Sequence, residues 1–281
     1  MSRVRQPKWG QHFLKDRSVC RKIADSLSLQ PDELVIEIGP GRGAITQLLA
    51  GRARRLVAIE IDGGLAEKLT EEFSAFAAVE ILHADFLKVD FSLLLNRHGR
   101  ERCYVFGNLP YYITSPILSH LFEMRASIRR MTLLMQREVA ERVTAKAGSR
   151  SYGYLSVLAQ LDSEPHIALA VPPGAFSPPP RVHSALVDFP IMTRFPLGKD
   201  RHHDAFLQFA GVCFHQKRKN LLNNLAQKYS RQIVQRLLES HGLKENIRAE
   251  ELDLVRLVEL FRAMSTNQKL EARNSKSATN H

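Results

Sequence analysis

The chain has 281 residues, of which 44% are hydrophobic and 25% charged, and these proportions are typical of a folded globular protein. They exclude a mainly disordered or collagen-like chain, and no stretch approaches the ~18 apolar residues that a membrane span needs. The first ten residues are basic and polar, so no secretory signal is expected. Three separated cysteines without a CxxC pair exclude a disulfide framework and a cysteine-rich zinc site, and they favour a reducing cytoplasm.

The charge is strongly basic. Lys and Arg number 40 against 29 Asp and Glu, which gives a net charge of +11. A basic balance of this size indicates a polyanionic partner, nucleic acid first of all. Charge alone does not decide the matter, because many basic proteins bind no anion specifically.

The first two thirds of the chain alternate short apolar runs with helical patterns. A basic arm over 2–8 precedes an expected helix over 16–29. The expected strands that follow are 34–38, 56–61, 79–83, 104–106 and 131–135. The expected helices between and after them are 44–50, 64–73, 117–123, 137–144 and 154–161. Strands that alternate with helices predict an α/β fold with a mostly parallel sheet, and 167–189 is expected to close it as an antiparallel hairpin.

The composition changes near 191–200, where proline and glycine interrupt the periodicity. We therefore predict a domain over 1–194, a small all-helical domain over 195–264 that opens with a long helix at 202–229, and a disordered tail over 265–281. Residues 195–281 hold 15 Lys and Arg against 9 Asp and Glu, or +6 of the +11. The second domain is thus the more basic one for its length.

A glycine-rich turn follows the first expected strand, in Glu37-Ile-Gly39-Pro-Gly41-Arg-Gly-Ala44. Glycines allow a sharp turn and a close approach of the backbone to a ligand. Gly39, Gly41 and Ala44 satisfy the dinucleotide fingerprint, and Glu60 stands at the end of the next strand, where an acid can bind ribose hydroxyls. A nicotinamide oxidoreductase is therefore one hypothesis.

Two further acids favour another adenosine cofactor. Glu37 points a carboxylate towards the glycine turn, which is unfavourable near a pyrophosphate but favourable near the α-amino group of a methionine moiety. Asp85, at the third strand end, can accept a hydrogen bond from the exocyclic amine of adenine, with Phe86 packed on the ring. A helix cap is the usual explanation for a lone Asp at a strand end, but the register of Asp85 with Glu60 counts against it here. The glycine turn, Glu60 for the ribose and Asp85 for the adenine follow one another on successive strands. This order fits S-adenosylmethionine better than NAD.

The fourth strand ends in Asn108-Leu109-Pro110-Tyr111. Acceptors from the Asn108 side chain and from the backbone carbonyl of Asn108 or Leu109 could hold the N6 hydrogens of an adenine, which would localise the nitrogen lone pair. Pro110 fixes φ and removes a competing donor. Tyr111 could stack on an extruded base. An ordinary proline turn with a packing tyrosine is the alternative for such a motif alone.

These motifs together resemble the ribosomal small-subunit RNA adenine dimethyltransferase family. The resemblance covers about residues 8–264 and adds Gln11-His-Phe-Leu14, Glu60-Ile-Asp62 and Phe176-Ser-Pro-Pro-Pro-Arg-Val182. It implies a Rossmann-like class I methyltransferase sheet and a metal-free enzyme that uses S-adenosylmethionine. The implied reaction is direct in-line methyl transfer to N6 of two adjacent adenosines near the 3′ end of 16S rRNA, in the 30S subunit.

The resemblance also implies roles for individual residues. Phe176 would give the second face of a base stack, or it would only pin its proline-rich turn. The implied catalytic residues are Asn108, Leu109, Pro110, Tyr111 and Phe176. The implied cofactor-binding residues are His12, Leu14, Glu37, Gly39, Gly41, Glu60, Ile61, Asp85, Phe86 and Asn108. The chain departs from the family's usual residues at His12 and Tyr112, where Asn is common, and at Tyr154, where Arg is common.

RNA contacts are expected mainly from the second domain. Lys217, Arg218 and Lys219 resemble the basic helix of the family's small domain and could touch phosphates, although a solvated helical face explains each one equally well. Arg181 and the arm residues Arg3, Arg5 and Lys8 are weaker candidates. His202, His203 and Cys213 are interpreted as ordinary helix positions, so no metal site is expected. We expect a monomer.

Two alternatives stay within this fold. One is an antibiotic-resistance dimethylase that acts on large-subunit RNA, against which the Asn-Leu-Pro-Tyr form and the 214–219 segment argue. The other is a non-catalytic RNA-binding assembly factor, against which the intact Glu60, Asp85, Asn108 and Tyr111 argue.

Overall fold

The computed structural model describes residues 11–195, 197 and 200–278. The chain divides into two compact units, 1–144 with 162–193 and 145–161 with 194–281. The basic arm over 2–8 lies outside the described residues. None of the helices in the described part of the chain combines the length and apolar character that crossing a bilayer requires.

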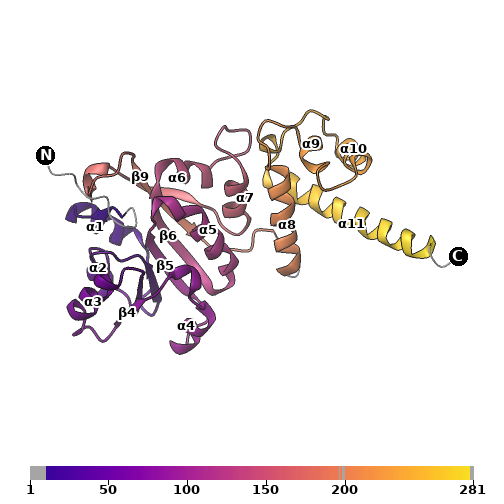
Figure 1. Ribbon diagram of the computed structural model, residues 1–281. Helices are drawn as coiled ribbons and strands as arrows, with labels where there is room; N and C mark the ends of the chain where they lie inside the picture. The colour runs from indigo at the N-terminus through magenta and orange to yellow at the C-terminus, as the bar shows by residue number, and fades with distance from the viewer. Residues whose placement is uncertain (1–10, 196, 198–199, 279–281) are drawn as a thin grey trace. The chain divides into compact units, whose positions relative to one another are not determined.

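The first unit is built on a seven-stranded sheet in the order β4-β3-β2-β5-β6-β9-β7 (Figure 1). Its strands are β2 (Leu34–Ile38), β3 (Arg55–Glu60), β4 (Val79–His83), β5 (Cys103–Asn108), β6 (Ile128–Gln136), β7 (His166–Val171) and β9 (Ser184–Pro190). Strands β2 to β6 pair in parallel, and β9 pairs antiparallel with both β6 and β7. The expected mostly parallel sheet and the closing antiparallel hairpin are both confirmed.

The helices of this unit follow the predicted pattern. They are α1 (Arg17–Ser26), α2 (Thr46–Ala50), α3 (Gly63–Glu72), α4 (Phe91–Arg97), α5 (Thr114–Glu123) and α6 (Arg137–Val143). Helix α1 begins at Asp16, whose side chain accepts from the backbone N–H groups of Ser18 and Val19. Helix α4 was not predicted. Its signal was Asp90, which caps it by accepting from Ser92 and Leu93 ahead of a short apolar face.

A second, two-stranded sheet ties the N-terminal segment to a distant loop. β1 (Phe13–Leu14) pairs antiparallel with β8 (Phe176–Ser177), and the Lys15 N–H donates to the carbonyl of Ala175 at 2.9 Å. Leu14 and Phe176 are both buried, in a cluster that also holds Ile23 of α1. This pairing holds His12 and Leu14 next to the main sheet, through a loop that lies more than 160 residues further along the chain.

The second unit is helical. Its helices are α7 (Tyr154–Leu161), α8 (Asp200–Cys213), α9 (Leu221–Leu225), α10 (Arg231–Ser240) and α11 (Leu254–Ala278). They share one apolar cluster, which includes Tyr152, Val157 and Leu161. Residues 145–161 therefore pack with the helical unit, whereas the sequence assigned them to the first domain.

Two predictions for this unit are wrong. The expected helix over 202–229 is interrupted at 214–220, because the Asn224 side chain donates to the carbonyls of Cys213 and Gln216 and thereby ends α8. Asn220 then caps α9 by accepting from the Asn223 N–H. The tail predicted to be disordered from residue 265 instead continues α11 to Ala278.

Candidate active site

The candidate site lies where the direction of the sheet order reverses. From β2 the chain proceeds outward to β3 and β4, and then returns to the other side of β2 as β5. Ligands of open α/β sheets bind at the carboxyl ends of the strands that flank this point. Gly39 follows β2 and Asn108 ends β5, so the two predicted motifs meet at the expected edge.

A cavity of about 1050 Å³, including its solvent-open mouth, occupies this edge. Thirteen of the predicted site residues line it: His12, Leu14, Glu37, Gly39, Gly41, Glu60, Ile61, Asp85, Phe86, Asn108, Leu109, Pro110 and Tyr111. The structure therefore gathers residues from four strand ends and from the N-terminal segment around one space.

The glycine turn needs its glycines. Gly39 and Gly41 have φ of +66° and +59°, values that L-residues with a side chain rarely adopt. A Cβ on Gly41 would stand 2.8 Å from Cδ1 of Phe13. The Gly41 N–H donates to Oε2 of Glu60 at 3.0 Å, so the turn and the ribose acid are held together before any ligand binds.

Glu60 and Asp85 have spare accepting capacity. Glu60 is 1% exposed, and its other oxygen accepts from the Asp62 N–H at 2.9 Å. A carboxylate offers about four acceptor positions, so two remain for hydroxyl donors from the cavity. Asp85 caps the turn at Phe86–Lys88 by accepting from the Leu87 N–H at 3.1 Å, and it also lines the cavity. Asp85 is therefore a cap that also lines the cavity, and its contact with adenine stays a prediction.

Glu37 is the anomalous charge of the site. It is 2% exposed in β2, a strand that is otherwise apolar and buried throughout, and its Oε2 has no hydrogen-bond partner among the described residues. Burial raises the pKa of Glu37 to about 8, the Thr46 hydroxyl opposes this shift, and the charge of Glu60 adds to it. A buried acid without a partner is costly, so this side chain fits a cationic or donor group brought by a ligand.

The orientation of Asn108 follows from its partner. Its Nδ2 lies 3.1 Å from the backbone carbonyl of His12. A carbonyl only accepts, so the amide nitrogen must face it, and Oδ1 is left without a partner in the described part of the chain. The contact comes from the backbone of His12, so the replacement of the usual Asn by His does not remove it. Asn108 therefore offers a bare acceptor at the cavity.

Tyr111 and His12 form an aromatic pair beside this acceptor. Their ring centroids are 5.4 Å apart at an interplanar angle of 34°. The Tyr111 hydroxyl bonds to the Ser184 hydroxyl at 2.6 Å, and His12 Nδ1 lies 2.8 Å from the carbonyl oxygen of Pro178. Burial raises the pKa of Tyr111, so the phenol stays neutral. Both rings are thus anchored to the β8–β9 region.

Phe176 does not join them, which corrects its predicted role in a stack. Its ring is 1% exposed and packs in the core cluster of the first unit, because β8 pairs with β1 and faces inward there. It is not among the residues that line the cavity. The alternative interpretation, an apolar residue that pins its proline-rich turn, is the one that the geometry favours.

Other residues that line the cavity were not predicted as site residues, among them Phe13, Arg42, Tyr112 and Ile117. The Arg42 guanidinium lies over the Phe13 ring, 4.7 Å from its centroid. The position of Phe13 could have been predicted, because it stands between His12 and Leu14, which were both predicted to line the site. That of Ile117 could not, since an apolar residue on a helix is ordinarily core.

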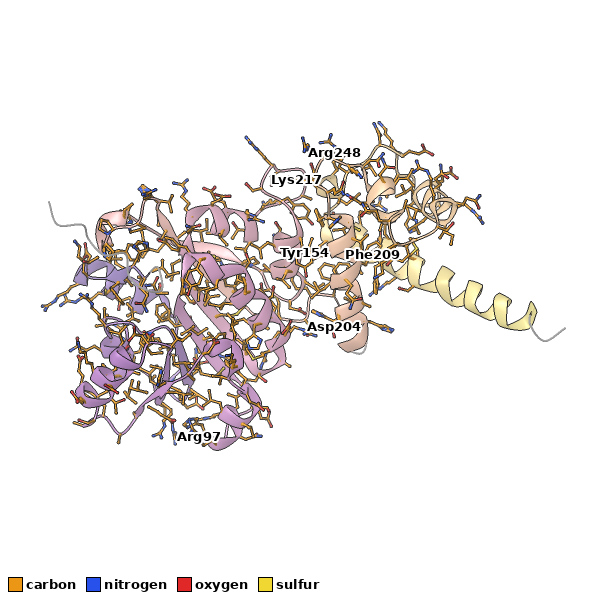
Figure 2. The ribbon with its side chains drawn as sticks, in the orientation of Figure 1. Arg97, Tyr154, Asp204, Phe209, Lys217 and Arg248 are labelled. Carbon is orange, nitrogen blue, oxygen red and sulfur yellow. The ribbon has the colours of Figure 1, made fainter. Side chains whose placement is uncertain are left out.

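The predicted phosphate contacts occupy exposed positions, but on turns. Lys217, Arg218 and Lys219 lie in the segment between α8 and α9 rather than on a helix, and all three are exposed. Lys217, labelled in Figure 2, donates to the carbonyl of Arg150 at 2.6 Å. Arg181 is exposed in the β8–β9 loop of the first unit. On a turn, the three consecutive cations are exposed together, whereas a helix would spread them around its circumference.

Comparison with known proteins decides the family. A model of the ribosomal RNA adenine dimethylase family matches residues 3–265. The chain belongs to this family. Among curated members, it is 47% identical over 92% of its length to the ribosomal RNA small subunit methyltransferase A of Acidobacterium capsulatum, 91% of which is covered. The protein of the same name from Koribacter versatilis is 42% identical, with 92% and 94% covered.

Solved structures agree with this membership of the dimethylase family. The 23S rRNA methyltransferase ErmE matches with a TM-score of 0.69 and 28% identity, covering 90% of this chain and 99% of that one. A dimethyladenosine transferase from Plasmodium falciparum matches with a TM-score of 0.73, covering 89% and 96% at 23% identity, and so supports the fold. The predicted class I methyltransferase fold is confirmed.

Proposed function

We propose that this protein is an enzyme that uses S-adenosylmethionine to convert two adjacent adenosines near the 3′ end of 16S rRNA to N6,N6-dimethyladenosine. The family membership supports an RNA adenine dimethyltransferase. The observation that carries the proposal is Asn108, which lines the ligand cavity and donates its Nδ2 hydrogen to the His12 carbonyl, so that its Oδ1 is left without a partner among the described residues.

The residues around the cavity fit the cofactor. The unpartnered Glu37 oxygen matches the α-amino group of the methionine moiety, and the spare acceptors of Glu60 match the ribose hydroxyls. Asp85 would accept from the adenine amine, with Phe86 beside it. The absence of a side chain on Gly39 would let the chain of the cofactor pass close to the backbone of the turn. When bound, S-adenosylmethionine supplies an electrophilic methyl group on a positively charged sulfur.

The residues of this chain prepare the adenine nitrogen. Its lone pair is delocalised into the ring, so N6 is a poor nucleophile while it stays planar. Asn108 Oδ1 would accept one N6 hydrogen, which favours a pyramidal nitrogen with its lone pair free. Tyr111 would stack on the extruded base and hold it in place. Catalysis then depends on positioning and on fixed dipoles around the reacting atoms.

Small-subunit RNA is favoured over large-subunit RNA. The curated relatives that are named for the small subunit reach 47% identity, whereas ErmE, which is named for 23S rRNA, reaches 28%. We propose that the enzyme acts as a monomer on the assembling 30S particle, which places it in the cytoplasm.

Incubation with tritiated S-adenosylmethionine tests this function. Small-subunit particles from a bacterial strain that lacks the modification would serve as substrate, and primer extension would locate the products. We expect label in the RNA and new stops at two adjacent adenosines near the 3′ end. Asn108→Ala should lower turnover by about 100-fold or more, as the loss of one preorganised dipole at a reacting centre typically does.

The same assay separates the alternatives. A non-catalytic assembly factor would bind the particles and leave the RNA unlabelled. An enzyme of the antibiotic-resistance type would label large-subunit RNA instead. Either result would overturn the proposal.

A further inference from the structure

The outer aromatic residue of the cavity has no role in the chemistry described above. Tyr112 lines the cavity beside Tyr111, yet 58% of it is exposed. It makes no hydrogen bond and no ring contact with any residue of the described chain. An exposed aromatic ring at the mouth of a ligand cavity is typical of a surface that binds something flat and apolar.

The local backbone directs the two tyrosines differently. They lie in the 3₁₀ turn Tyr111–Ile113, which follows Pro110. With about three residues per turn, neighbouring side chains of such a turn point roughly 120° apart. Tyr111 turns inward and bonds to Ser184 on β9, whereas Tyr112 turns towards solvent. One cavity thus carries an inner, anchored ring and an outer, free ring.

The proposed reaction creates a need for the outer ring. Extruding the target adenosine from its stack leaves the neighbouring base without one stacking partner, at a cost of a few kcal/mol. Each base that stacks on an aromatic side chain regains roughly 1–3 kcal/mol. Phe176 cannot supply this contact, because its ring is in the core.

We propose that Tyr112 stacks on the base next to the target adenosine. The enzyme would therefore prefer RNA in which this neighbouring base is a purine. This inference rests on the proposed function and adds a binding position for a second nucleotide outside the catalytic pocket. The two target adenosines are adjacent, so each provides the neighbouring purine for the other. Asn, the residue common in the family at this position, offers no comparable face.

Kinetics on unmodified 30S particles test the inference. Tyr112→Ala should raise KM for particles about 10-fold, which corresponds to about 1.4 kcal/mol of stacking, with affinity for S-adenosylhomocysteine unchanged. Tyr112→Phe keeps the ring and should restore the wild-type KM. Phe76→Ala is the matched control, because Phe76 is 47% exposed in the same unit but does not line the cavity, and it should leave KM unchanged.

A substrate change isolates the stacking contact. Particles in which one of the two adenosines is uridine keep a single target with a weakly stacking neighbour. The kcat/KM of wild-type enzyme should be lower on these particles than on unaltered ones. The kcat/KM of Tyr112→Ala should be nearly the same on both, since the substitution and the uridine remove one shared contact.

Three results would overturn the inference while the proposed function stands. They are an unchanged KM in Tyr112→Ala, a Tyr112→Phe enzyme as weak as Tyr112→Ala, or an equal loss of S-adenosylhomocysteine affinity, which would place Tyr112 on the cofactor. Failure of the wild-type enzyme to label any particle would instead refute the proposed function.

Discussion

At the scale of single residues, the proposed function divides the site into groups that would bind the cofactor and groups that would hold the base. Glu37, Glu60 and Asp85 lie at strand ends on one side of the switch point, whereas Asn108 ends β5 and Tyr111 lies in the turn that follows it. Substitutions on the two sides should therefore affect different measurable constants.

Tyr111→Ala should lower turnover about 10-fold or more, because the loss of stacking of roughly 1–3 kcal/mol falls on the base. The dissociation constant of S-adenosylhomocysteine, measured by calorimetry, should stay within about twofold of wild type. Tyr111→Phe is the control, since it keeps the ring and loses only the bond to Ser184. A parallel loss of cofactor affinity in the alanine variant would contradict the stacking role.

Glu37 should give the ligand-free protein a distinctive pH dependence. Its pKa is about 8 in the folded state against an ordinary value of 4.5, so between these values the folded protein holds a proton that the unfolded chain has released. The contribution of Glu37 to stability is therefore present below about pH 4.5 and declines as the pH rises towards 8. Urea unfolding at several pH values should show this decline in wild type and its absence in Glu37→Gln.

The same residue should report on cofactor binding. A cationic amino group opposite Glu37 favours the carboxylate, so binding of S-adenosylhomocysteine at pH 7 should release a proton. Calorimetry in buffers of different ionisation enthalpy measures this release. Equal proton release by wild type and Glu37→Gln would show that another group is responsible.

At the scale of elements, the strands of the main sheet and the glycine turn could be predicted, but the end of α8 could not. β2 and β4 have the predicted bounds, because an apolar run between turn residues leaves little choice. The end of α8 depends on Asn224, which lies eleven residues beyond Cys213 and folds back onto its carbonyl. Helical periodicity continues through the break and gives no sign of it.

The glycine turn yields a prediction at this scale. Gly41→Ala places a methyl group 2.8 Å from Phe13 in a backbone of positive φ, so the turn must shift away from Glu60. We expect affinity for S-adenosylhomocysteine to fall more than 10-fold. Gly51→Ala is the control, because its Cβ would meet nothing within 4 Å and its φ is −93°. Equal affinities in the two variants would show that cofactor binding does not depend on the close packing of Gly41 against Phe13.

At the scale of the whole molecule, the residues that converge on the cavity could be predicted better than the local structure of the proposed RNA-binding residues. The strand ends converge because of topology, which the alternation of strands and helices reveals. Phe176 shows where this reasoning fails, since motif order predicts proximity but not whether a ring faces the cavity or the core. Residues 145–161 show a similar failure at the domain boundary. Their apolar face could pack against either core, and the sequence does not indicate that it joins the helical unit.

The turn at 217–219 should contribute to RNA affinity through charge alone. Replacing Lys217, Arg218 and Lys219 with alanine should weaken binding to 30S particles without changing cofactor affinity. The slope of log K against log salt should fall by about one for each phosphate contact that is lost. An unchanged slope would show that these exposed cations do not touch phosphates.

A crystal structure of the complex with S-adenosylhomocysteine tests the central claim most directly. The account predicts the ribose hydroxyls on Glu60, the amino group beside Glu37, and the sulfur atom facing the space in front of Asn108 Oδ1. A sulfur atom directed away from β5, or an Asn108 amide whose Oδ1 is bonded to a protein donor, would contradict it.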